Sequence, residues 1–367
     1  MKLECTQANL QRGLGLVGRS VGNRTTLPVL ANILLRTEKG RLRLSATDLE
    51  VGVSTLIGAK VDSDGDITLP ARLLSEFIAT NSDEKVTIET KGTDARLVSK
   101  HYQATVKGIE ATEFPTIPEI TADFEAELSI ADFKTAIAQT VFAAAVDETR
   151  PVLAGVLIKI DGDGFKMVAT DSFRLAEKTL KIEKKVDKKI SVVVPARTMI
   201  ELSRLLEEAT GAVRLRLGEN QVAFSAGDLY LVSRVIEGAF PDYEQIIPAT
   251  TPTHSLVERS ELIDAMKMST LFARDAANNI KMTVAAKQIE VLATSPQLGE
   301  NRSQVVAQTK GEEMTIAFNA KYLLDALLVM GGKQVDMGFV GKLNPCVLKN
   351  PTDKSFLCIV MPLRVET

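Results

Sequence analysis

One short stretch has the residue types and spacing of a cofactor site. The letters GLGLVG at residues 13–18 match the glycine spacing GxGxxG of dinucleotide-binding enzymes, and Glu38 follows near the distance of a ribose-binding acid. A nicotinamide-dependent enzyme is therefore one hypothesis. That motif must directly follow a strand, however, and the preceding letters TQANLQR have helical character. Close packing of a glycine-bearing helix is the favoured interpretation.

The other candidates for chemistry are weaker. DSDGD at 62–66 resembles a calcium loop, but its glycine comes early and Leu73 stands where such a loop ends in glutamate. A solvated turn between strands is favoured. The histidines, His101 and His254, lie far apart, which argues against zinc chemistry and histidine-based triads. No Ser, Cys or Lys nucleophile has a general base in a recognisable motif. We therefore predict no catalytic residue, no metal and no cofactor.

Composition and charge limit the classes of protein and of partner. The 367 residues are 45% hydrophobic and 25% charged, which is typical of a soluble globular protein of two or three domains. No apolar run is long enough for a membrane helix, and the N-terminus has no apolar signal core, so we expect a cytoplasmic protein. The net charge of −3 argues against a protein that holds nucleic acid by overall charge. A DNA partner would need a local patch, or a means of retention other than affinity.

The cysteines are interpreted as small buried hydrophobic residues in a reducing compartment, because they form no CxxC pair and their number is odd. They are Cys5, Cys346 and Cys358.

The strongest signal is an internal repeat. The letters Ala-Thr-Asp end the segment 27–48 and also the segment 150–171, and Asp171 lies 123 residues after Asp48. Both segments predict a β-hairpin whose turn contains glycine, EKG in the first copy and DGDG in the second. A fainter third copy covers 280–295, where Ser295 replaces the aspartate.

A second marker recurs at nearly the same spacing. The stretches LPARLLSEFI, VPARTMIELSRLL and FNAKYLLDALLVM each predict the beginning of a helix and align at Arg72, Arg197 and Lys321. Another helix is predicted near the start of each copy, at 6–21, 129–145 and 260–273, with Ser129 and Ser260 as N-caps. We infer a chain of three α+β domains, each with two helices and several antiparallel strands. Their boundaries are 1–121, 122–248 and 249–367.

The basic residue at each helix start indicates a use, because the helix dipole disfavours a cation there. A cation beside helix N-terminal N–H groups makes an anion site, and phosphate is the obvious anion. Arg24 adds a cation in the polar loop before the first hairpin. Arg150 takes the matching place in the second copy, next to acidic Asp147 and Glu148.

Several motifs, in order along the whole chain, resemble the bacterial DNA polymerase III beta subunit family of sliding clamps: TLPVLANILL, VATDSFRLA, FPDYEQIIP and the terminal CIVMPLRV. The resemblance implies a head-to-tail homodimer, a closed ring of six similar domains around duplex DNA. Such a ring is retained on DNA topologically, so weak contacts to phosphates without sequence reading suffice. By resemblance the DNA contacts are Arg24, Arg72, Arg150 and Arg197, and Lys321 joins them through the repeat.

The family also implies a hydrophobic pocket for short peptides of the polymerase, the clamp loader and repair proteins. Its matching residues are Leu153, Thr170, Phe173, Arg174, Leu175, Pro241, Ile246, Val360, Met361, Pro362 and Leu363. Burying a Leu and a Phe of a peptide would contribute roughly 1.5–3 kcal/mol each, which after ordering costs indicates affinities near micromolar.

The sequence departs from the family pattern at three places. The chain continues past Val365 with Glu366 and Thr367, which adds charge near the expected pocket mouth. Ser172 and Phe173 stand where a glycine and a smaller or more polar residue are expected, which narrows the pocket. The dimer contact should join the 102–106 strand, with Ala104 and Val106, to Leu271 and Phe272 of the next subunit, and Ala104 is small for that role. Besides the clamp and the nicotinamide enzyme, a repeat scaffold that binds peptides without DNA is a third hypothesis.

Overall fold

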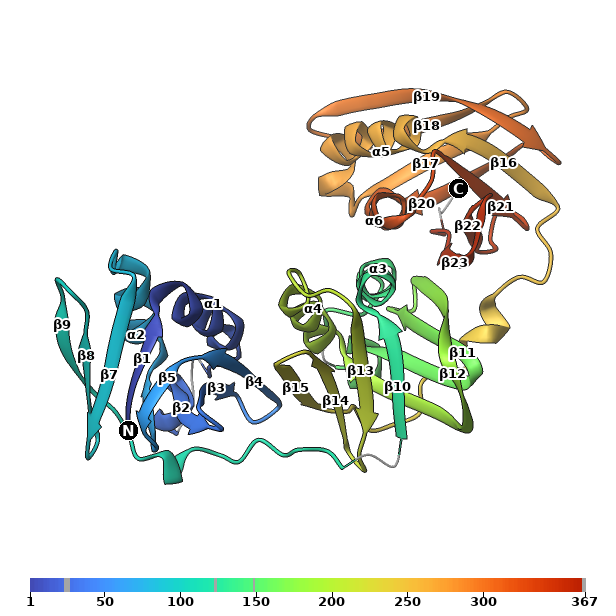
Figure 1. The fold of residues 1–367 in the computed structure, drawn as a ribbon. Coiled ribbons are helices and arrows are strands. Elements are labelled where there is room, and N and C mark those ends of the chain that lie inside the picture. Colours follow the sequence, from blue (N-terminus) through green and yellow to red (C-terminus); the bar gives the residue numbers. More distant parts are fainter. Residues whose placement is uncertain (23–26, 122–123, 148, 365–367) are drawn as a thin grey trace. The chain divides into compact units, whose positions relative to one another are not determined.

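The computed structural model describes residues 1–22, 27–121, 124–147 and 149–364 (Figure 1). Arg24 lies outside these residues. The chain divides into two compact units, one of residues 1–130 with 204–235 and the other of 131–203 with 236–367. The middle third of the sequence therefore contributes to both units. No helix in the described residues is long and apolar enough to span a membrane.

Within the described residues, each third of the chain contains two α-helices and a set of antiparallel strands, as the repeat predicts. The helices are α1 (Gln7–Val17), α2 (Ala71–Thr80), α3 (Ile130–Val141), α4 (Ala196–Leu205), α5 (Arg259–Ala273) and α6 (Ala320–Val329). The strands of the first third are β1 (Lys2–Thr6), β2 (Asn32–Glu38), β3 (Arg41–Thr47), β4 (Val51–Gly58), β5 (Lys60–Ser63), β6 (Asp66–Pro70), β7 (Lys85–Lys91), β8 (Asp94–Val98) and β9 (Gln103–Lys107). Those of the second are β10 (Phe124–Ser129), β11 (Gly155–Thr170), β12 (Arg174–Pro195), β13 (Ala212–Leu217), β14 (Gln221–Ala226) and β15 (Leu229–Arg234). The third contains β16 (Thr253–Glu258), β17 (Asn279–Val284), β18 (Gln288–Ser295), β19 (Gly299–Lys310), β20 (Met314–Asn319), β21 (Gln334–Phe339), β22 (Cys346–Asn350) and β23 (Asp353–Val360).

The strands form three sheets, and two of the sheets cross the repeat junctions. The first unit contains a five-stranded sheet, β5-β1-β7-β8-β9, and an eight-stranded sheet, β10-β13-β14-β15-β4-β3-β2-β6. The second unit contains a ten-stranded sheet, β11-β12-β23-β22-β21-β16-β19-β18-β17-β20. The first junction pairs β4 with β15, where Val51 lies opposite Ser233. The second pairs β12 with β23, where Arg174 lies opposite Val360. The N–H of Arg234 donates to the carbonyl of Glu50, and the N–H of Met361 donates to the carbonyl of Phe173. Because Phe173 follows Glu50, and Arg174 follows Val51, by the same repeat offset, both junctions have the same register.

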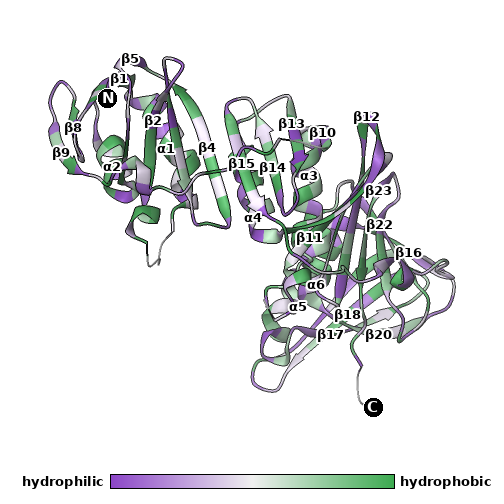
Figure 2. Ribbon diagram, turned by 90° about the horizontal axis from the view of Figure 1, so that it is seen from below, coloured by the Kyte–Doolittle hydropathy of each residue, from purple (hydrophilic) through white to green (hydrophobic). Residues whose placement is uncertain are grey.

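The core is built by alternation of apolar and polar residues along the strands. In Figure 2 hydrophobic colour follows the strands of both units, while part of β12, whose middle has the letters KKVDKK, is hydrophilic. Leu175, Tyr243 and Ile359 belong to one buried cluster beside the second junction. The three cysteines are free and buried, which confirms their interpretation as small core residues.

Gly13 and Gly15 of GLGLVG lie inside α1, and Gly18 directly follows its last residue, so the hypothesis of a dinucleotide-binding turn is wrong. Thr6 caps this helix by accepting a hydrogen bond from the N–H of Asn9. A Cβ on Gly13 would lie 2.7 Å from Leu44 Cδ1 and 2.9 Å from Ile57 Cγ2, so the helix packs on its sheet at a distance that only glycine permits. Gly15 has open space around it.

Several local predictions differ from the structure in detail. The helix predicted at 6–21 ends at Val17 and continues as a short 3₁₀ turn, and the one predicted at 129–145 ends at Val141. Ser260 lies within α5 instead of capping it, because the helix begins at Arg259. The DGDG turn is a bend inside β11, where the pairing with β12 shifts register and Gly162 has φ of 61°. The stretch DSDGD connects β5 to β6, as a turn between strands should.

Candidate functional site

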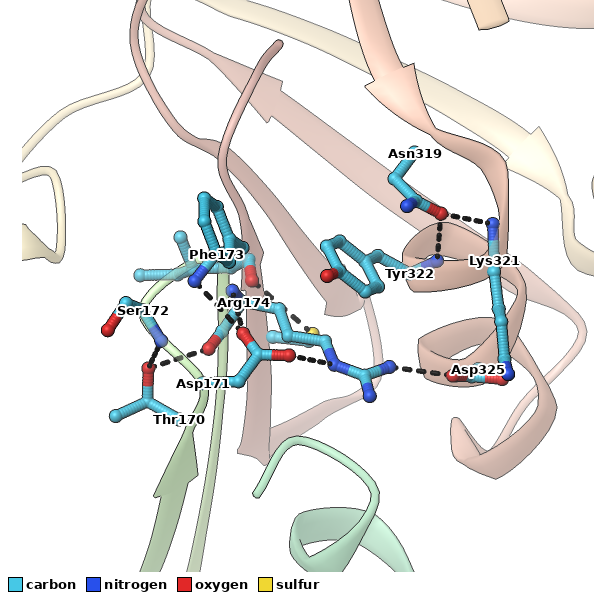
Figure 3. A network of polar contacts seen from close by, with 11 residues as sticks. Thr170, Asp171, Ser172, Phe173, Arg174, Asn319, Lys321, Tyr322 and Asp325 are labelled. Atoms are coloured by element: carbon cyan, nitrogen blue, oxygen red, sulfur yellow. Dashed lines mark hydrogen bonds and ion pairs between the residues drawn. The ribbon is translucent and has the colours of Figure 1, made fainter. Parts of the chain in front are cut away.

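The Thr-Asp loop between β11 and β12 is a tight turn fixed by its own side chains (Figure 3). The Thr170 hydroxyl donates to the carbonyl of Arg174 at 2.7 Å and accepts from the N–H of Ser172 at 3.1 Å. The Asp171 carboxylate accepts from the N–H groups of Phe173 and Arg174, both at 2.9 Å. Ser172 has φ of 78°, in the left-handed region that favours glycine. The turn leaves the ring of Phe173 largely exposed, at 56%.

Arg174 points from this loop into a polar and aromatic enclosure (Figure 3). Its Nε lies 3.0 Å from Asp171 Oδ2, and its Nη1 donates to Asp325 Oδ2 of α6 at 2.6 Å. The guanidinium carbon lies 4.7 Å from the ring centre of Tyr322 and 5.4 Å from that of Phe142. With only 9% of Arg174 exposed, the cation is held by two carboxylates and two aromatic faces. In this structure it links the second repeat to α6 of the third.

Burial also affects the phenol in this enclosure. Burial raises the pKa of Tyr322, and the nearby Asp171 carboxylate raises it further while Arg174 lowers it. Tyr322 is therefore a neutral aromatic wall at physiological pH.

The C-terminal segment continues the wall of the loop. The N–H of Met361 donates to the carbonyl of Phe173 at 2.8 Å, and the N–H of Leu363 donates to the carbonyl of Ala317 at 2.8 Å. The half-buried Met361 and Leu363 are thereby fixed in the second unit beside the loop and β20. The structure thus brings Thr170, Phe173, Arg174, Leu175, Val360 and Met361 together at the second junction.

The remaining predicted pocket residues differ in accessibility. Leu153 and Leu175 are buried, at 6% and 0% exposure, so they support the site from within the core. Ile246 is 41% exposed and ends the 3₁₀ turn Tyr243–Ile246, and the carbonyl of Pro241 accepts from the N–H of Tyr243. Exposed apolar side chains at Phe173 and Ile246 leave surface that an apolar ligand could cover.

The predicted DNA-binding cations occupy different settings. Arg72, Arg197 and Lys321 are each the second residue of their helices, α2, α4 and α6, which confirms the predicted helix starts. All three are exposed, and Arg72 forms an ion pair with Glu76 at 2.8 Å. Arg150 directly precedes the 3₁₀ helix Pro151–Ala154 rather than an α-helix. Its Nη1 lies 3.5 Å from the Ser172 hydroxyl, at the Thr-Asp loop.

Two of the predicted dimer residues lie on an edge strand and the other two on helix α5, which packs against β18 and β19. Ala104 and Val106 are on β9, an edge strand that pairs with β8 in the described part of the chain. Residues 299–306 of β19 pair with β18, and only the following residues of β19 pair with β16. Leu271 of α5 is 57% exposed, and Phe272 is half-buried. Among the residues that the structure describes, no group of three or more His, Cys, Asp or Glu side chains could hold a metal ion.

Comparison with known proteins agrees with the repeat over nearly the whole sequence. Models of the N-terminal, central and C-terminal domains of the DNA polymerase III beta subunit match residues 1–118, 127–242 and 244–364 in turn. The chain belongs to the DNA polymerase III beta subunit family. Three clamp domains, each with helices and antiparallel strands, therefore follow one another along the chain.

Individual members of the family resemble the chain over its full length. It is 31% identical to the beta sliding clamp of Bacillus subtilis, across 99% of this chain and all of that one, and 32% identical to that of Synechococcus elongatus, across the whole of both. The crystal structure of the Bacillus subtilis sliding clamp superimposes with a TM-score of 0.96 at 30% identity, covering both chains completely. A clamp of Pseudomonas aeruginosa bound to griselimycin gives 0.95 at 28% identity, with the same coverage. Each of these relatives is named as a sliding clamp, and the chain belongs to their family over its full length.

Sequence reasoning missed three members of the Arg174 enclosure, namely Phe142, Tyr322 and Asp325. Asp325 follows Arg174 by 151 residues, and no periodicity connects the two. The available signal was local: Tyr322 and Asp325 are three positions apart and therefore share one face of α6.

Proposed function

We propose that two copies of this chain close head to tail into a ring around duplex DNA and act without a catalytic step of their own. The ring is a cytoplasmic processivity factor, and its subunits comprise domains 1–121, 122–248 and 249–367. The single observation that carries the proposal is the repetition of one junction. Val51 with Ser233 and Arg174 with Val360 are equivalent pairs, so each repeat meets the next by the same strand addition.

Ring closure follows from two strand segments that have no partner on one side in the described chain, namely β9 and residues 299–306 of β19. One strand in each repeat follows the Thr-Asp or Thr-Ser turn, and these equivalent strands are β4, β12 and residues 299–306 of β19. By the same logic β9 corresponds to β15 and β23. We expect β9 of one subunit to pair with residues 299–306 of the next, because edge strands present unpaired N–H and C=O groups. Ala104 and Val106 then face the neighbour's Leu271 and Phe272.

DNA retention needs only weak contacts in a closed ring. Arg72, Arg197 and Lys321 stand at equivalent helix starts, where a phosphate would meet both a cation and helix N–H groups. Arg24 and Arg150 are proposed as further contacts, although the position of Arg150 beside Ser172 favours a role at the rim of the peptide site. Contacts of this kind carry no sequence information, so the ring can slide.

The second junction is proposed as the site that tethers partners. An extended peptide of the polymerase, the clamp loader or a repair protein would lay apolar side chains on Phe173, Ile246, Met361, Pro362 and Leu363, with Leu153 and Leu175 behind them. Thr170 and Arg174 keep the turn in shape. Affinities near micromolar fit partners that must exchange.

A loading experiment tests the ring. The assembled protein should have twice the 39.8 kDa mass of the chain in light scattering. Loaded onto nicked circular DNA, it should stay bound, and it should be lost once the circle is cut. Equal loss from circular and linear DNA, or a monomer at all concentrations, contradicts the ring.

Charge reversal separates the ring from a scaffold that binds peptides alone. The triple variant Arg72→Glu, Arg197→Glu, Lys321→Glu should remain dimeric and support less processive synthesis. Reversal at Arg36, which pairs with Asp66 on the strands, serves as the control. Unchanged DNA retention and processivity in the triple variant would favour the scaffold.

A further inference from the structure

The first repeat junction carries a copy of the Thr-Asp turn. The Thr47 hydroxyl donates to the carbonyl of Val51 at 2.9 Å and accepts from the N–H of Leu49 at 3.0 Å. The Asp48 carboxylate accepts from the N–H groups of Glu50 and Val51 at 3.0 and 2.8 Å. Every bond has its counterpart at the second junction, and Leu49 has φ of 77° where Ser172 has 78°. The backbone of the peptide site is therefore present twice.

A groove of about 410 Å³ lies at this first junction, within one compact unit. Six of its lining residues occupy the repeat positions of residues predicted at, or adjoining, the peptide site. Thr47 corresponds to Thr170, Glu50 to Phe173 and Gly52 to Leu175. Pro115, Ser233 and Arg234 correspond to Pro241, Val360 and Met361.

The chemistry of the two grooves differs at the mouth. Glu50 replaces the exposed ring of Phe173, and Arg234 replaces Met361. Both side chains are exposed, and the N–H of Arg234 donates to the carbonyl of Glu50 at 3.0 Å, so the two residues face each other across paired strands. The apolar part consists of Leu49, 49% exposed, and the half-buried Ile117, with Val232 buried beneath them at 4% exposure. A Cβ on Gly52 would lie 3.0 Å from Ile117 Cγ2, so this floor is closely packed.

We propose that the first junction binds a second class of short extended peptide, one with an apolar side chain followed by an acidic residue. The apolar side chain covers Leu49 and Ile117, above the buried Val232, and the carboxylate pairs with the Arg234 guanidinium, whose fork matches it in two bonds. Glu50 opposes such a peptide and limits its affinity. The inference rests on the proposed peptide function of the second junction, whose backbone it shares, but it concerns a different groove and a different ligand charge.

Methyl NMR of the dimer tests the proposal directly. The probes are the blocked peptide acetyl-Gly-Leu-Asp-Leu-Gly-amide and its matched lysine analogue, each titrated to millimolar concentration. The aspartate peptide should shift the methyl signals of Leu49, Ile117 and Val232, and the lysine peptide should shift them several-fold less. Arg234→Glu should reverse this preference, and Glu50→Gln should tighten the aspartate peptide several-fold.

The variant Phe173→Asp distinguishes peptide binding at the first junction from binding at the second. It removes the aromatic surface of the second junction and should leave the shifts at Leu49, Ile117 and Val232 unchanged. If those shifts disappear in Phe173→Asp, the peptide occupies only the second junction and the inference is overturned. Absence of shifts at the first junction, or shifts that ignore the charge of residue 234, overturns it as well. The proposed tethering function is tested separately: partner binding should be lost in Phe173→Asp and retained in Arg234→Glu. That result would support tethering at the second junction whether or not the first junction binds the aspartate peptide.

Discussion

Leu49 and Ser172 share one left-handed backbone conformation, with φ of 77° and 78°, although neither is glycine. Each follows the aspartate of its Thr-Asp turn, where two N–H groups bind one carboxylate oxygen. A side chain in this region costs roughly 1–2 kcal/mol relative to the right-handed form. The bonds of the turn hold the conformation against that cost.

Replacing Ser172 by glycine should therefore stabilise the second unit. Glycine removes the steric cost of the left-handed conformation, and this effect is larger than the free-energy cost of ordering a more flexible unfolded chain. We expect the free energy of unfolding to rise by about 0.5–1 kcal/mol. Urea unfolding followed by circular dichroism measures it. Ser172→Ala retains the Cβ and should show no gain, and a glycine variant less stable than the alanine variant contradicts the role of strain.

Gly13 and Gly15 of α1 offer a matched pair. Ala at 13 places its Cβ 2.7 Å from Leu44 Cδ1, so we expect a loss of about 1–3 kcal/mol despite better helix propensity. Ala at 15 meets open space and should stabilise the protein by roughly 0.5–1 kcal/mol. The unfolding midpoints of the two variants should move in opposite directions. Equal shifts would mean that α1 does not pack on its sheet as described.

The elements that the sequence predicted well are those fixed by local chemistry. The helix starts at Arg72, Arg197 and Lys321 follow from turn residues and apolar spacing. The repeat itself required only comparison of the chain with itself. The family resemblance then supplied the residues of the second junction, six of which the structure gathers there.

What the sequence could not predict depends on contacts between distant segments. Arg174 was expected to be a polar marker of an open pocket, yet Asp325 holds it from 151 residues away. Helix α6 provides the partner, and neither residue has an unusual neighbour in sequence. The groove beside Arg234 could not be predicted from the sequence either, because its lining residues come from two repeats and the linker between them.

The acid dependence of the turn before β9 can be predicted from Asp83. Burial raises the pKa of this carboxyl, but hydrogen bonds from the Ser99 hydroxyl and from the backbone and ring of His101 outweigh it, lowering the pKa from 3.8 to about 2. Because the folded pKa lies below the ordinary value, the stabilisation is present above pH ~4 and is lost as the pH falls toward 2. Carboxyl-resolved NMR titration should report the value near 2.

Two variants check this origin. Ser99→Ala should raise the pKa of Asp83 toward its ordinary value, and Asp83→Asn should remove its share of the acid-dependent loss of stability. A titration midpoint near 3.8 in the unmodified protein would show that the turn does not hold the carboxylate.

Arg174 should be among the residues whose loss is most damaging to the second unit. Arg174→Ala leaves Asp171 and Asp325 without their shared cation and opens space beside Tyr322, and we expect about 3 kcal/mol of destabilisation. Arg174→Lys keeps the charge but loses the planar fork, so its stability should lie between those of the unmodified protein and the alanine variant. Arg214→Ala removes a pair in which both side chains are about half exposed, and it should cost less than ~1 kcal/mol.

Asp325 then distinguishes a strut from a ligand-binding cation. If Arg174 acts by holding the turn, Asp325→Asn should weaken both stability and the binding of peptides that carry no acidic residue, since the turn that presents Phe173 loses an anchor. A free cation would behave differently: removing Asp325 would release Arg174 and strengthen binding of acidic peptides alone. Calorimetric titration of one neutral and one acidic peptide against the asparagine variant decides between the two, because only the strut predicts a loss for the neutral peptide.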